Sequence, residues 1–331
     1  MSGSYIRVEN LKKYFATKRG MLHAVDDVCF EIKKGETLGL VGESGCGKST
    51  LGRCLIRLLD STAGKVLLKD NEGGGYTDIT KASPREMKEL RKRVQIVFQD
   101  PYSCLNPRLS VWELIAEPLI VNGIYSDKNE MRRRIRSLMD TVGLAERLEN
   151  SYPHELDGGR RQRIGIARSL ALNPEFIVLD EPVSALDVCI QAQILNLLND
   201  LQKEFAYTYV FISHNLSVVR HVSDRIAVMY LGQIVELSEY RELFSTPLHP
   251  YTQALLSAIP LAKLDVKRER IILEGDVPSP IEPPEACRFA GRCRYAKDIC
   301  RNTPPALKEI LPGHFAACHY AKENMQNVHN A

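Results

Sequence analysis

The sequence lacks an apolar run that approaches the roughly 20 residues needed to span a bilayer. Its apolar runs, such as residues 176–179, have the length of a strand. The first twenty residues contain no apolar core of the kind found in a signal peptide. We therefore expect the protein to be made and kept in the cytoplasm, with any association with the membrane being peripheral.

The sequence also lacks an excess of charge of either sign. It has 44 basic and 41 acidic residues, a formal net charge of +3, and its basic residues are scattered between acidic ones. Proteins dedicated to nucleic acids gain affinity from a basic face that neutralises phosphates, so we expect no nucleic-acid partner. The 331 residues, 44 % of them hydrophobic, are typical of a globular protein with about two domains.

Alternating apolar runs and turn-like segments predict an α/β fold. Residues 5–9 and 24–32 have strand character. Residues 37–41 form an apolar run, a glycine-rich loop follows, and residues 49–59 are compatible with a helix. This order of strand, loop and helix is typical of a phosphate-binding unit. Further apolar runs indicate buried strands of a largely parallel sheet, at residues 94–98, 176–179, 209–212 and 226–229.

Two regions differ from this α/β core. Between residues 99 and 171 the sequence has longer, charged segments with helical periodicity, which predict an inserted helical subdomain. After residue 247 prolines become frequent and the periodicity fades, which indicates a small, loop-rich C-terminal module. The predicted domains are residues 1–247, containing the helical subdomain at about 99–171, and residues 248–331.

Residues 42–49 match the pattern G-x-x-x-x-G-K-[ST] between a predicted strand and a predicted helix. In such a loop the backbone N–H groups and the helix N-terminus face a phosphate group. The lysine reaches the β- and γ-phosphates, and the serine hydroxyl ligates Mg²⁺. The sequence therefore predicts a site for a nucleoside triphosphate, formed by Gly42, Glu43, Ser44, Gly45, Cys46, Gly47, Lys48, Ser49 and Thr50.

Polar side chains follow two further predicted strands. Asp180 and Glu181 come directly after residues 176–179, and His214 follows residues 209–212. Ligands bind at the carboxyl ends of strands in open α/β sheets. We expect Asp180 to hold hydrated Mg²⁺, Glu181 to act as general base on the attacking water, and His214 to contact the γ-phosphate. The alternatives are solvated acids at a strand end and a structural histidine.

Further motifs resemble those of the ATPases of ABC transporters. Residues 156–163, L-D-G-G-R-R-Q-R, resemble the LSGGQ signature, and residues 184–187, S-A-L-D, resemble the D-loop. The resemblance covers about residues 5–250 with the motifs in the family's order. The run P-Y-T-Q-A-L-L at 250–256 and the cysteine-rich tail resemble those of ATPases in the dipeptide, oligopeptide and nickel importer branch. Within that branch the chain is most similar to the second ATPase of the dipeptide or oligopeptide systems.

The resemblance implies roles for residues at these motifs. Gln99 is similar to the Q-loop glutamine that ligates Mg²⁺. Phe15, or less favourably its neighbour Tyr14, matches the A-loop aromatic that stacks on adenine. The signature acts in trans on the nucleotide of a partner ATPase, and the D-loop lies beside it; these motifs contain Asp157, Gly158, Gly159 and Arg160, and Ser184 and Asp187.

The resemblance also implies the assembly and the activity. Two ATPases pair head to tail, hydrolyse ATP and drive two membrane permease subunits, to which an extracytoplasmic binding protein delivers the substrate. The chain is then an ATPase of a dipeptide or oligopeptide importer at the cytoplasmic face of the membrane. The alternatives are an importer of nickel or another small solute and a soluble ABC ATPase without a transport role.

The signature departs from the family pattern at two positions. Asp157 replaces the serine that contacts the γ-phosphate in trans, and Arg160 replaces the glutamine. A carboxylate about 4 Å from a phosphate oxygen costs about 4 kcal/mol at an effective dielectric of about 20. The hypothesis is an asymmetric heterodimer in which this chain's signature forms the weaker site. The alternative is that Asp157 merely caps its helix and points away from phosphate.

Four cysteines crowd the C-terminal module. Cys287, Cys293, Cys300 and Cys318 are separated by five, six and seventeen residues. In a reducing compartment such a group indicates metal binding rather than disulfides. Structural zinc sites usually contain closer pairs, so the wide gaps favour an iron–sulfur cluster, and the tail resembles one that binds [4Fe–4S] in dipeptide-importer ATPases. Zn²⁺ and unligated thiols in a small core are the alternatives.

Overall fold

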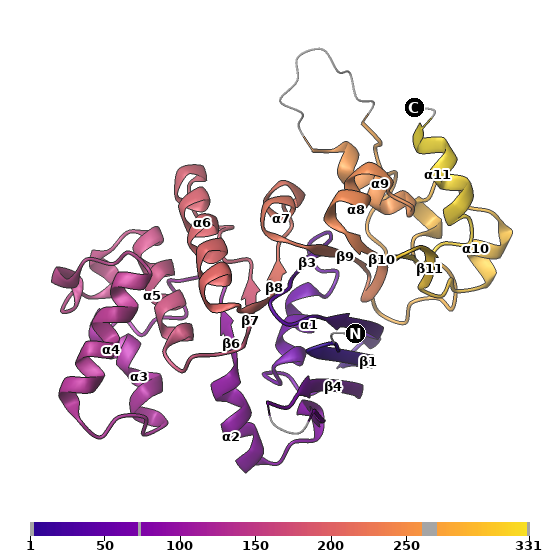
Figure 1. Cartoon of the computed structure of the whole chain (residues 1–331). Helices are drawn as coiled ribbons and strands as arrows, with labels where there is room; N and C mark the ends of the chain where they lie inside the picture. The colour runs from indigo at the N-terminus through magenta and orange to yellow at the C-terminus, as the bar shows by residue number, and fades with distance from the viewer. Residues whose placement is uncertain (1–2, 72–73, 260–269, 330–331) are drawn as a thin grey trace. The chain divides into compact units, whose positions relative to one another are not determined.

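The structure is a computed structural model that describes residues 3–71, 74–259 and 270–329. The chain divides into two compact units (Figure 1): unit 1 comprises residues 1–81 and 211–331, and unit 2 comprises residues 82–210. Among the described residues, no helix is long and apolar enough to cross a membrane. Both units combine strands with helices, so the fold is α/β, as predicted.

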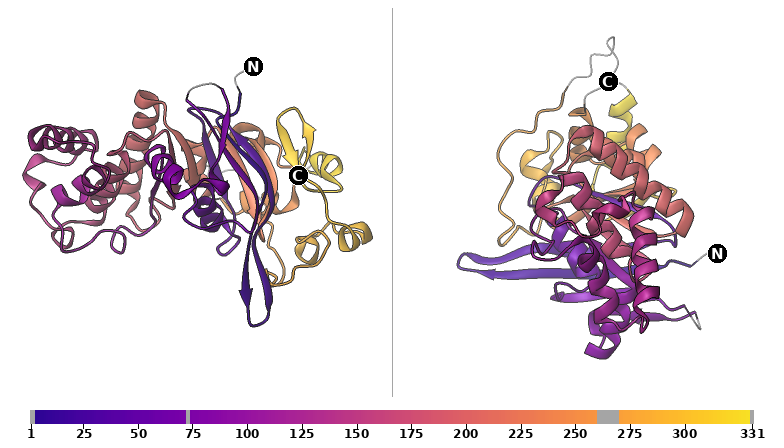
Figure 2. Two further views of the ribbon diagram at one scale, coloured as in Figure 1. Left: turned by 90° about the horizontal axis from the view of Figure 1, so that it is seen from below. Right: turned by 90° about the vertical axis from the view of Figure 1, so that its left-hand side faces the viewer.

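Unit 1 contains a four-stranded antiparallel sheet with the strand order β2-β1-β4-β5. Its first two strands are a long hairpin that turns at Lys18 and Arg19 (Figure 2), whereas the sequence predicted strand character only at residues 5–9 and 24–32. Its hydrophobic residues face the core in alternation, as expected for a sheet with one buried face. The strands are β1 (Ile6–Thr17), β2 (Gly20–Ile32), β4 (Ala63–Lys69) and β5 (Tyr76–Asp78).

A second group of strands in unit 1 carries the glycine loop. All five residues of β3 (Thr37–Val41) are buried, which confirms the predicted strand at 37–41, and β3 runs parallel to β9 (Arg225–Tyr230). Beyond β9 the strands pair in antiparallel fashion, in the order β9, β10 (Gln233–Glu239), β12 (His314–Ala316) and β11 (Lys308–Leu311). The helices of this unit are α1 (Lys48–Leu55), α7 (Leu216–Val222), α8 (Tyr240–Ser245), α9 (Pro250–Ser257), α10 (Asp298–Asn302) and α11 (Ala321–His329).

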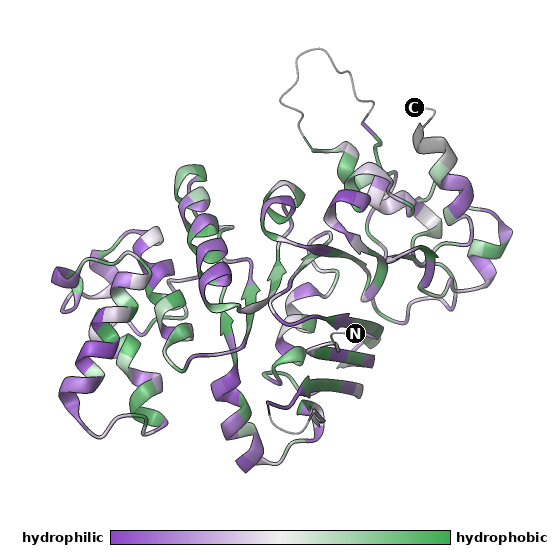
Figure 3. Cartoon of the chain, viewed as in Figure 1, coloured by the Kyte–Doolittle hydropathy of each residue, from purple (hydrophilic) through white to green (hydrophobic). Residues whose placement is uncertain are grey.

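Unit 2 is mainly helical around two parallel strands, β6 (Val94–Val97) and β7 (Phe176–Asp180). The chain passes from unit 2 into unit 1 within β8 (Thr208–Ile212). Figure 3 shows hydrophobic residues along β7 and polar residues along α2, whose buried positions are Met87 and Leu90. The helices are α2 (Pro84–Arg93), α3 (Val111–Val121), α4 (Lys128–Thr141), α5 (Gly158–Leu170) and α6 (Val188–Phe205).

A buried carboxylate attaches the C-terminal elements to β10. The side chain of Glu236 is fully buried and accepts hydrogen bonds from the backbone N–H groups of Leu248 (2.7 Å) and His249 (2.9 Å). Its Oε1 atom also lies 2.7 Å from Nε2 of His314 on β12. One side chain thus holds both the start of α9 and the C-terminal hairpin, because buried polar groups require partners.

We expect Glu236→Ala to lower the free energy of unfolding by about 3 kcal/mol, since it leaves two buried N–H groups and a buried imidazole without their acceptor. Denaturant unfolding followed by circular dichroism measures this change. Glu239→Ala is the matched control, because that side chain lies at the exposed end of the same strand. Equal effects of the two substitutions would contradict the role assigned to Glu236.

Candidate functional site

The glycine loop between β3 and α1 packs directly against neighbouring backbone. Gly42 has a φ of +153°, and a Cβ atom there would lie 2.1 Å from the carbonyl oxygen of Met229. Gly47 caps α1 with a φ of +106°, and its Cβ would lie 2.0 Å from the carbonyl oxygen of Ala24. Glycine is therefore required at both positions by backbone conformation and by space.

The Lys48 ammonium lies inside this loop. Its Nζ donates hydrogen bonds to the carbonyl oxygens of Gly42 (2.8 Å) and Glu43 (2.9 Å), and the residue is 5 % exposed. Burial raises the pKa of the Cys46 thiol, which keeps it uncharged beside the lysine. Ser49 and Thr50 occupy the first turn of α1, while Ser44 and Gly45 are exposed at the tip of the loop. The arrangement concentrates positive charge where the sequence predicts phosphate.

Two partners of the loop come from the C-terminal region and were missed from the sequence. The Glu43 N–H donates to the Tyr251 hydroxyl at 2.8 Å. The Glu43 carboxylate accepts two hydrogen bonds from the Arg292 guanidinium, at 2.8 and 3.3 Å. No local sequence pattern could have paired Glu43 with Arg292, because 249 positions separate them.

In unit 2 the structure brings the predicted glutamine and the predicted general base together. β7 delivers Asp180, which is 1 % exposed, and Glu181 follows with a left-handed φ of +47°. Because β6 runs parallel to β7, both strands end at the same edge, and the Gln99 side-chain amide donates to Glu181 Oε2 at 3.1 Å. The N–H and hydroxyl of Ser184 both donate to the Glu181 carbonyl oxygen, at 3.2 and 3.1 Å. Glu181 thus connects Gln99 of the predicted Q-loop with Ser184 of the predicted D-loop.

The predicted signature residues form the N-terminus of α5. Asp157 is the N-cap, and its Oδ1 accepts the Arg160 N–H at 2.8 Å while Oδ2 lies 3.4 Å from Arg160 Nε. A Cβ atom on Gly158 would lie 3.1 Å from Leu186, and one on Gly159 would lie 2.7 Å from Ile190. The two glycines therefore allow α5 to approach the D-loop and the start of α6, whose N-cap is Asp187.

The two aromatic candidates for adenine stacking have different environments. The Tyr14 ring stacks on His23 with 4.0 Å between centroids, and its hydroxyl donates to Asp26, which also binds Arg288. Burial, together with the bond to Asp26, raises the pKa of the Tyr14 hydroxyl. The neighbouring Phe15 is 37 % exposed. The internal contacts thus occupy the Tyr14 ring, whereas the Phe15 ring is partly exposed and has the Lys13 ammonium 4.8 Å from its centroid.

His214 follows β8, as predicted, and its side chain is exposed. The preceding residue, Ser213, donates its N–H to the carbonyl oxygen of Leu40 at 3.1 Å. Leu40 lies on β3, two residues before Gly42. The backbone therefore places His214 on the rim next to the strand that leads into the glycine loop.

The four C-terminal cysteines converge on one small pocket of about 20 Å³. Burial raises the pKa of the Cys287 thiol to about 11, that of Cys318 to about 12, and that of Cys293 as well. The backbone N–H groups of Phe289, Tyr320 and Tyr295, each two residues further along the chain, partly offset this rise in pKa. Within the described ranges, however, no three His, Cys, Asp or Glu side chains are arranged to hold a metal ion. The geometry shows a thiol-lined pocket and does not by itself support the predicted cluster.

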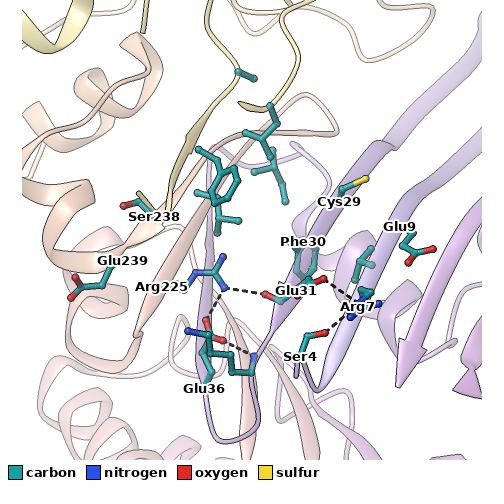
Figure 4. Close-up of a pocket in the computed structure, with 18 of the residues that line it drawn as sticks. Ser4, Arg7, Glu9, Cys29, Phe30, Glu31, Glu36, Arg225, Ser238 and Glu239 are labelled. Carbon is teal, nitrogen blue, oxygen red and sulfur yellow. Dashed lines mark hydrogen bonds and ion pairs between the residues drawn. The ribbon is translucent and has the colours of Figure 1, made fainter. Parts of the chain in front are cut away.

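A much larger pocket of about 1240 Å³ lies elsewhere in unit 1 (Figure 4). Its walls come from β1, β2, β9, β10 and the C-terminal hairpin. Two arginines in its lining are paired with carboxylates: Arg7 with Glu31 at 3.1 Å, and Arg225 with Glu36 at 3.1 Å. Neither of these arginines is therefore as available to a phosphate group as an unpaired cation would be.

Comparison with known proteins identifies two matching families. Residues 25–184 match the family described as ABC transporter, and residues 235–300 match the C-terminal region of oligopeptide/dipeptide transporters. The chain is 51 % identical over 324 residues to the oligopeptide transport ATP-binding protein AppF of Bacillus subtilis (strain 168), covering 95 % of this chain and 96 % of that protein. It is 48 % identical to OppF of the same organism, with 97 % and 98 % covered.

Solved structures of ABC cassettes share the fold. The dimeric bacterial ABC transporter cassette MJ0796 aligns with a TM-score of 0.63 and 31 % identity, covering 71 % of this chain and 99 % of that chain. Its dimeric post-hydrolysis state bound to ADP and phosphate gives the same TM-score with 30 % identity. The similarity extends over most of the present chain.

We expect Gly47→Ala to abolish ATP binding, because the added methyl group would collide with the Ala24 carbonyl and displace the loop from its lysine. Gly313→Ala is the matched control: its φ is also positive, at +72°, but no atom lies within 4 Å of the added Cβ and the residue lies outside the glycine loop. It should cost only about 1 kcal/mol of backbone strain. Titration with a fluorescent ATP analogue measures both affinities, and equal losses would contradict the importance of the close approach.

Proposed function

Because the chain belongs to the ATP-binding proteins of ABC transporters, in their oligopeptide and dipeptide branch, we propose a specific role for each of its motif residues. The protein is an ABC ATPase that energises the import of peptides. One observation supports the assignment of its site above all. The ammonium group of Lys48 is buried in a loop that requires glycine at positions 42 and 47. ATP and Mg²⁺ are its cofactors.

We assign the phosphates to residues 42–50 and the metal to three side chains. Lys48 neutralises the β- and γ-phosphates, and Ser49, Gln99 and Asp180 ligate Mg²⁺ directly or through water. Glu181 accepts a proton from the attacking water, and Gln99, bonded to it at 3.1 Å, holds its carboxylate in place. His214 contacts the γ-phosphate. Phe15 stacks on adenine, because its ring is accessible whereas Tyr14 is occupied by His23 and Asp26.

We propose that the protein works as one of two different ATPase subunits. The second ATPase, two membrane permeases and an extracytoplasmic binding protein complete an importer, with this chain peripheral to the cytoplasmic face of the membrane. Support comes from relatives that are named as oligopeptide transport ATP-binding proteins. The nucleotide-binding domain covers residues 1–247 with its helical subdomain at about 99–171, and the C-terminal module covers 248–331, in keeping with the separate match at 235–300.

The signature of this chain forms the weaker of the two ATP sites. Asp157 keeps a capping hydrogen bond, so α5 begins as it would with serine, yet its side chain remains 60 % exposed. An exposed carboxylate at this helix N-terminus would face the γ-phosphate of the partner's nucleotide and repel it. The Arg160 guanidinium, 3.4 Å away, offsets part of this repulsion. The site that uses Lys48, Asp180, Glu181 and His214 is the competent one.

The test is the ATPase rate of the complete transporter in lipid vesicles. Glu181→Gln should reduce hydrolysis by about a thousandfold, because it removes the general base. Asp157→Ser should leave the rate unharmed or raise it, because it removes a negative charge from the partner's phosphate. A loss with Asp157→Ser comparable to that with Glu181→Gln would contradict the asymmetry, while an unaffected Glu181→Gln variant would contradict the catalytic assignment.

The thiol pocket is the proposed ligand set of a [4Fe–4S] cluster, with Zn²⁺ as the alternative. Cys287, Cys293, Cys300 and Cys318 supply four thiolates around one pocket, the donor set that either centre requires. Backbone N–H groups lower the pKa of three of these thiols against the effect of burial, which favours the thiolate form that a metal requires. The centre would act as a structural link within a module that has a small core of its own.

Metal analysis of anaerobically purified protein tests this assignment. We expect about four iron atoms and four acid-labile sulfides per chain, with a brown colour that Cys300→Ser abolishes. Cys104→Ser is the control, because this thiol belongs to unit 2 and does not line the pocket. One zinc atom per chain would favour the alternative, and protein free of both metals would contradict a metal centre.

A further inference from the structure

We propose that Arg292 and Tyr251 of the C-terminal region are positioning residues of the ATP site, and that their hold on Glu43 sets the affinity for ATP. The inference rests on the proposed function, because it takes the glycine loop as the phosphate site. It assigns to the C-terminal region a part in nucleotide binding that acts through Glu43. The supporting contacts all lie within unit 1.

Glu43 is fastened at three points. The Tyr251 hydroxyl accepts its N–H at 2.8 Å, and Lys48 Nζ donates to its carbonyl oxygen at 2.9 Å. The Arg292 guanidinium binds both carboxylate oxygens, at 2.8 and 3.3 Å. Because the same residue touches Lys48 and the two C-terminal side chains, a displacement of Glu43 would also displace the lysine that neutralises phosphate.

The ion pair between Arg292 and Glu43 also neutralises a negative charge in the loop. Glu43 is an acid among the residues that surround a triphosphate, and an uncompensated carboxylate there would repel the ligand. The Arg292 side chain is 9 % exposed and that of Glu43 is 27 % exposed, so solvent screens the pair less than it would a surface pair. The bidentate geometry fits a guanidinium better than an ammonium. Arg292 therefore neutralises the loop as well as holding it.

An aromatic cluster fixes the positions of these partners. Phe289 packs against Tyr230 and Tyr251, with 5.3 and 5.5 Å between ring centroids, and its carbonyl oxygen accepts the Arg292 N–H at 3.0 Å. The residue after Arg292 is Cys293, which lines the thiol pocket. The short segment between Cys287 and Cys293 thus connects that pocket to the glycine loop through one ion pair.

The experiment measures the ATP affinity of the full-length protein with a fluorescent ATP analogue, together with its unfolding temperature. We expect Arg292→Ala to weaken binding about tenfold and Arg292→Lys to weaken it less, since a lysine keeps the charge without the paired hydrogen bonds. Tyr251→Phe should weaken binding about threefold. Arg294→Ala is the matched control, because this arginine is exposed two positions away in the same segment.

The double variant Glu43→Ala/Arg292→Ala tests whether Arg292 acts by neutralising Glu43 or only by supporting the fold in general. If Arg292 neutralises Glu43, removing both side chains restores affinity to within about threefold of the parent protein. A double variant as weak as Arg292→Ala would overturn the neutralising role of Arg292, and parental affinity in Arg292→Ala would overturn the whole proposal. Lys48→Ala tests the underlying site: if its affinity is unchanged, the phosphate assignment is wrong; if it alone loses binding, only the present inference is wrong.

Discussion

The glycine loop depends on the approach of its backbone to the carbonyl groups of Ala24 and Met229. These contacts leave no space for a Cβ atom at Gly42 or Gly47, and they fix the turn that brings Lys48 into the loop. β2 and β9, which supply the two carbonyls, therefore belong to the site as much as the motif does. The rest of the proposed chemistry presupposes this packing, because a lysine displaced from the loop would no longer meet the phosphates.

Acidic residues occur in two motifs that the family uses to bind phosphate, and each is paired with an arginine. Asp157 lies 3.4 Å from Arg160 on the same helix, in an exposed position. Glu43 is bound by Arg292, which is nearly buried. Solvent therefore weakens the attraction between Asp157 and Arg160 far more than that between Glu43 and Arg292. Neutralisation is therefore stronger in the glycine loop than at the signature.

The C-terminal region is held to the core by polar contacts in several places. Glu236 binds the start of α9 and the C-terminal hairpin, Arg288 binds Asp26, and Arg292 binds Glu43. Such contacts suit a module with little hydrophobic core, because each buried ion pair requires a defined geometry. They also explain why a region outside the ABC-transporter match at residues 25–184 reaches the phosphate loop.

Local periodicity and fixed spacing were enough to predict the α/β class, the glycine loop and the strand that leads to Asp180 and Glu181. The sequence indicated β3 with its observed bounds and placed Gln99 and Glu181 after two predicted strands, which the structure shows to be neighbours. The long hairpin of β1 and β2 was underestimated, since its exposed half has no apolar alternation. The folded structure was needed to identify the partners of Glu43, the different environments of Tyr14 and Phe15, and the convergence of the four thiols. These contacts join residues far apart in the chain, and no local pattern specifies which of many charged or aromatic side chains will meet.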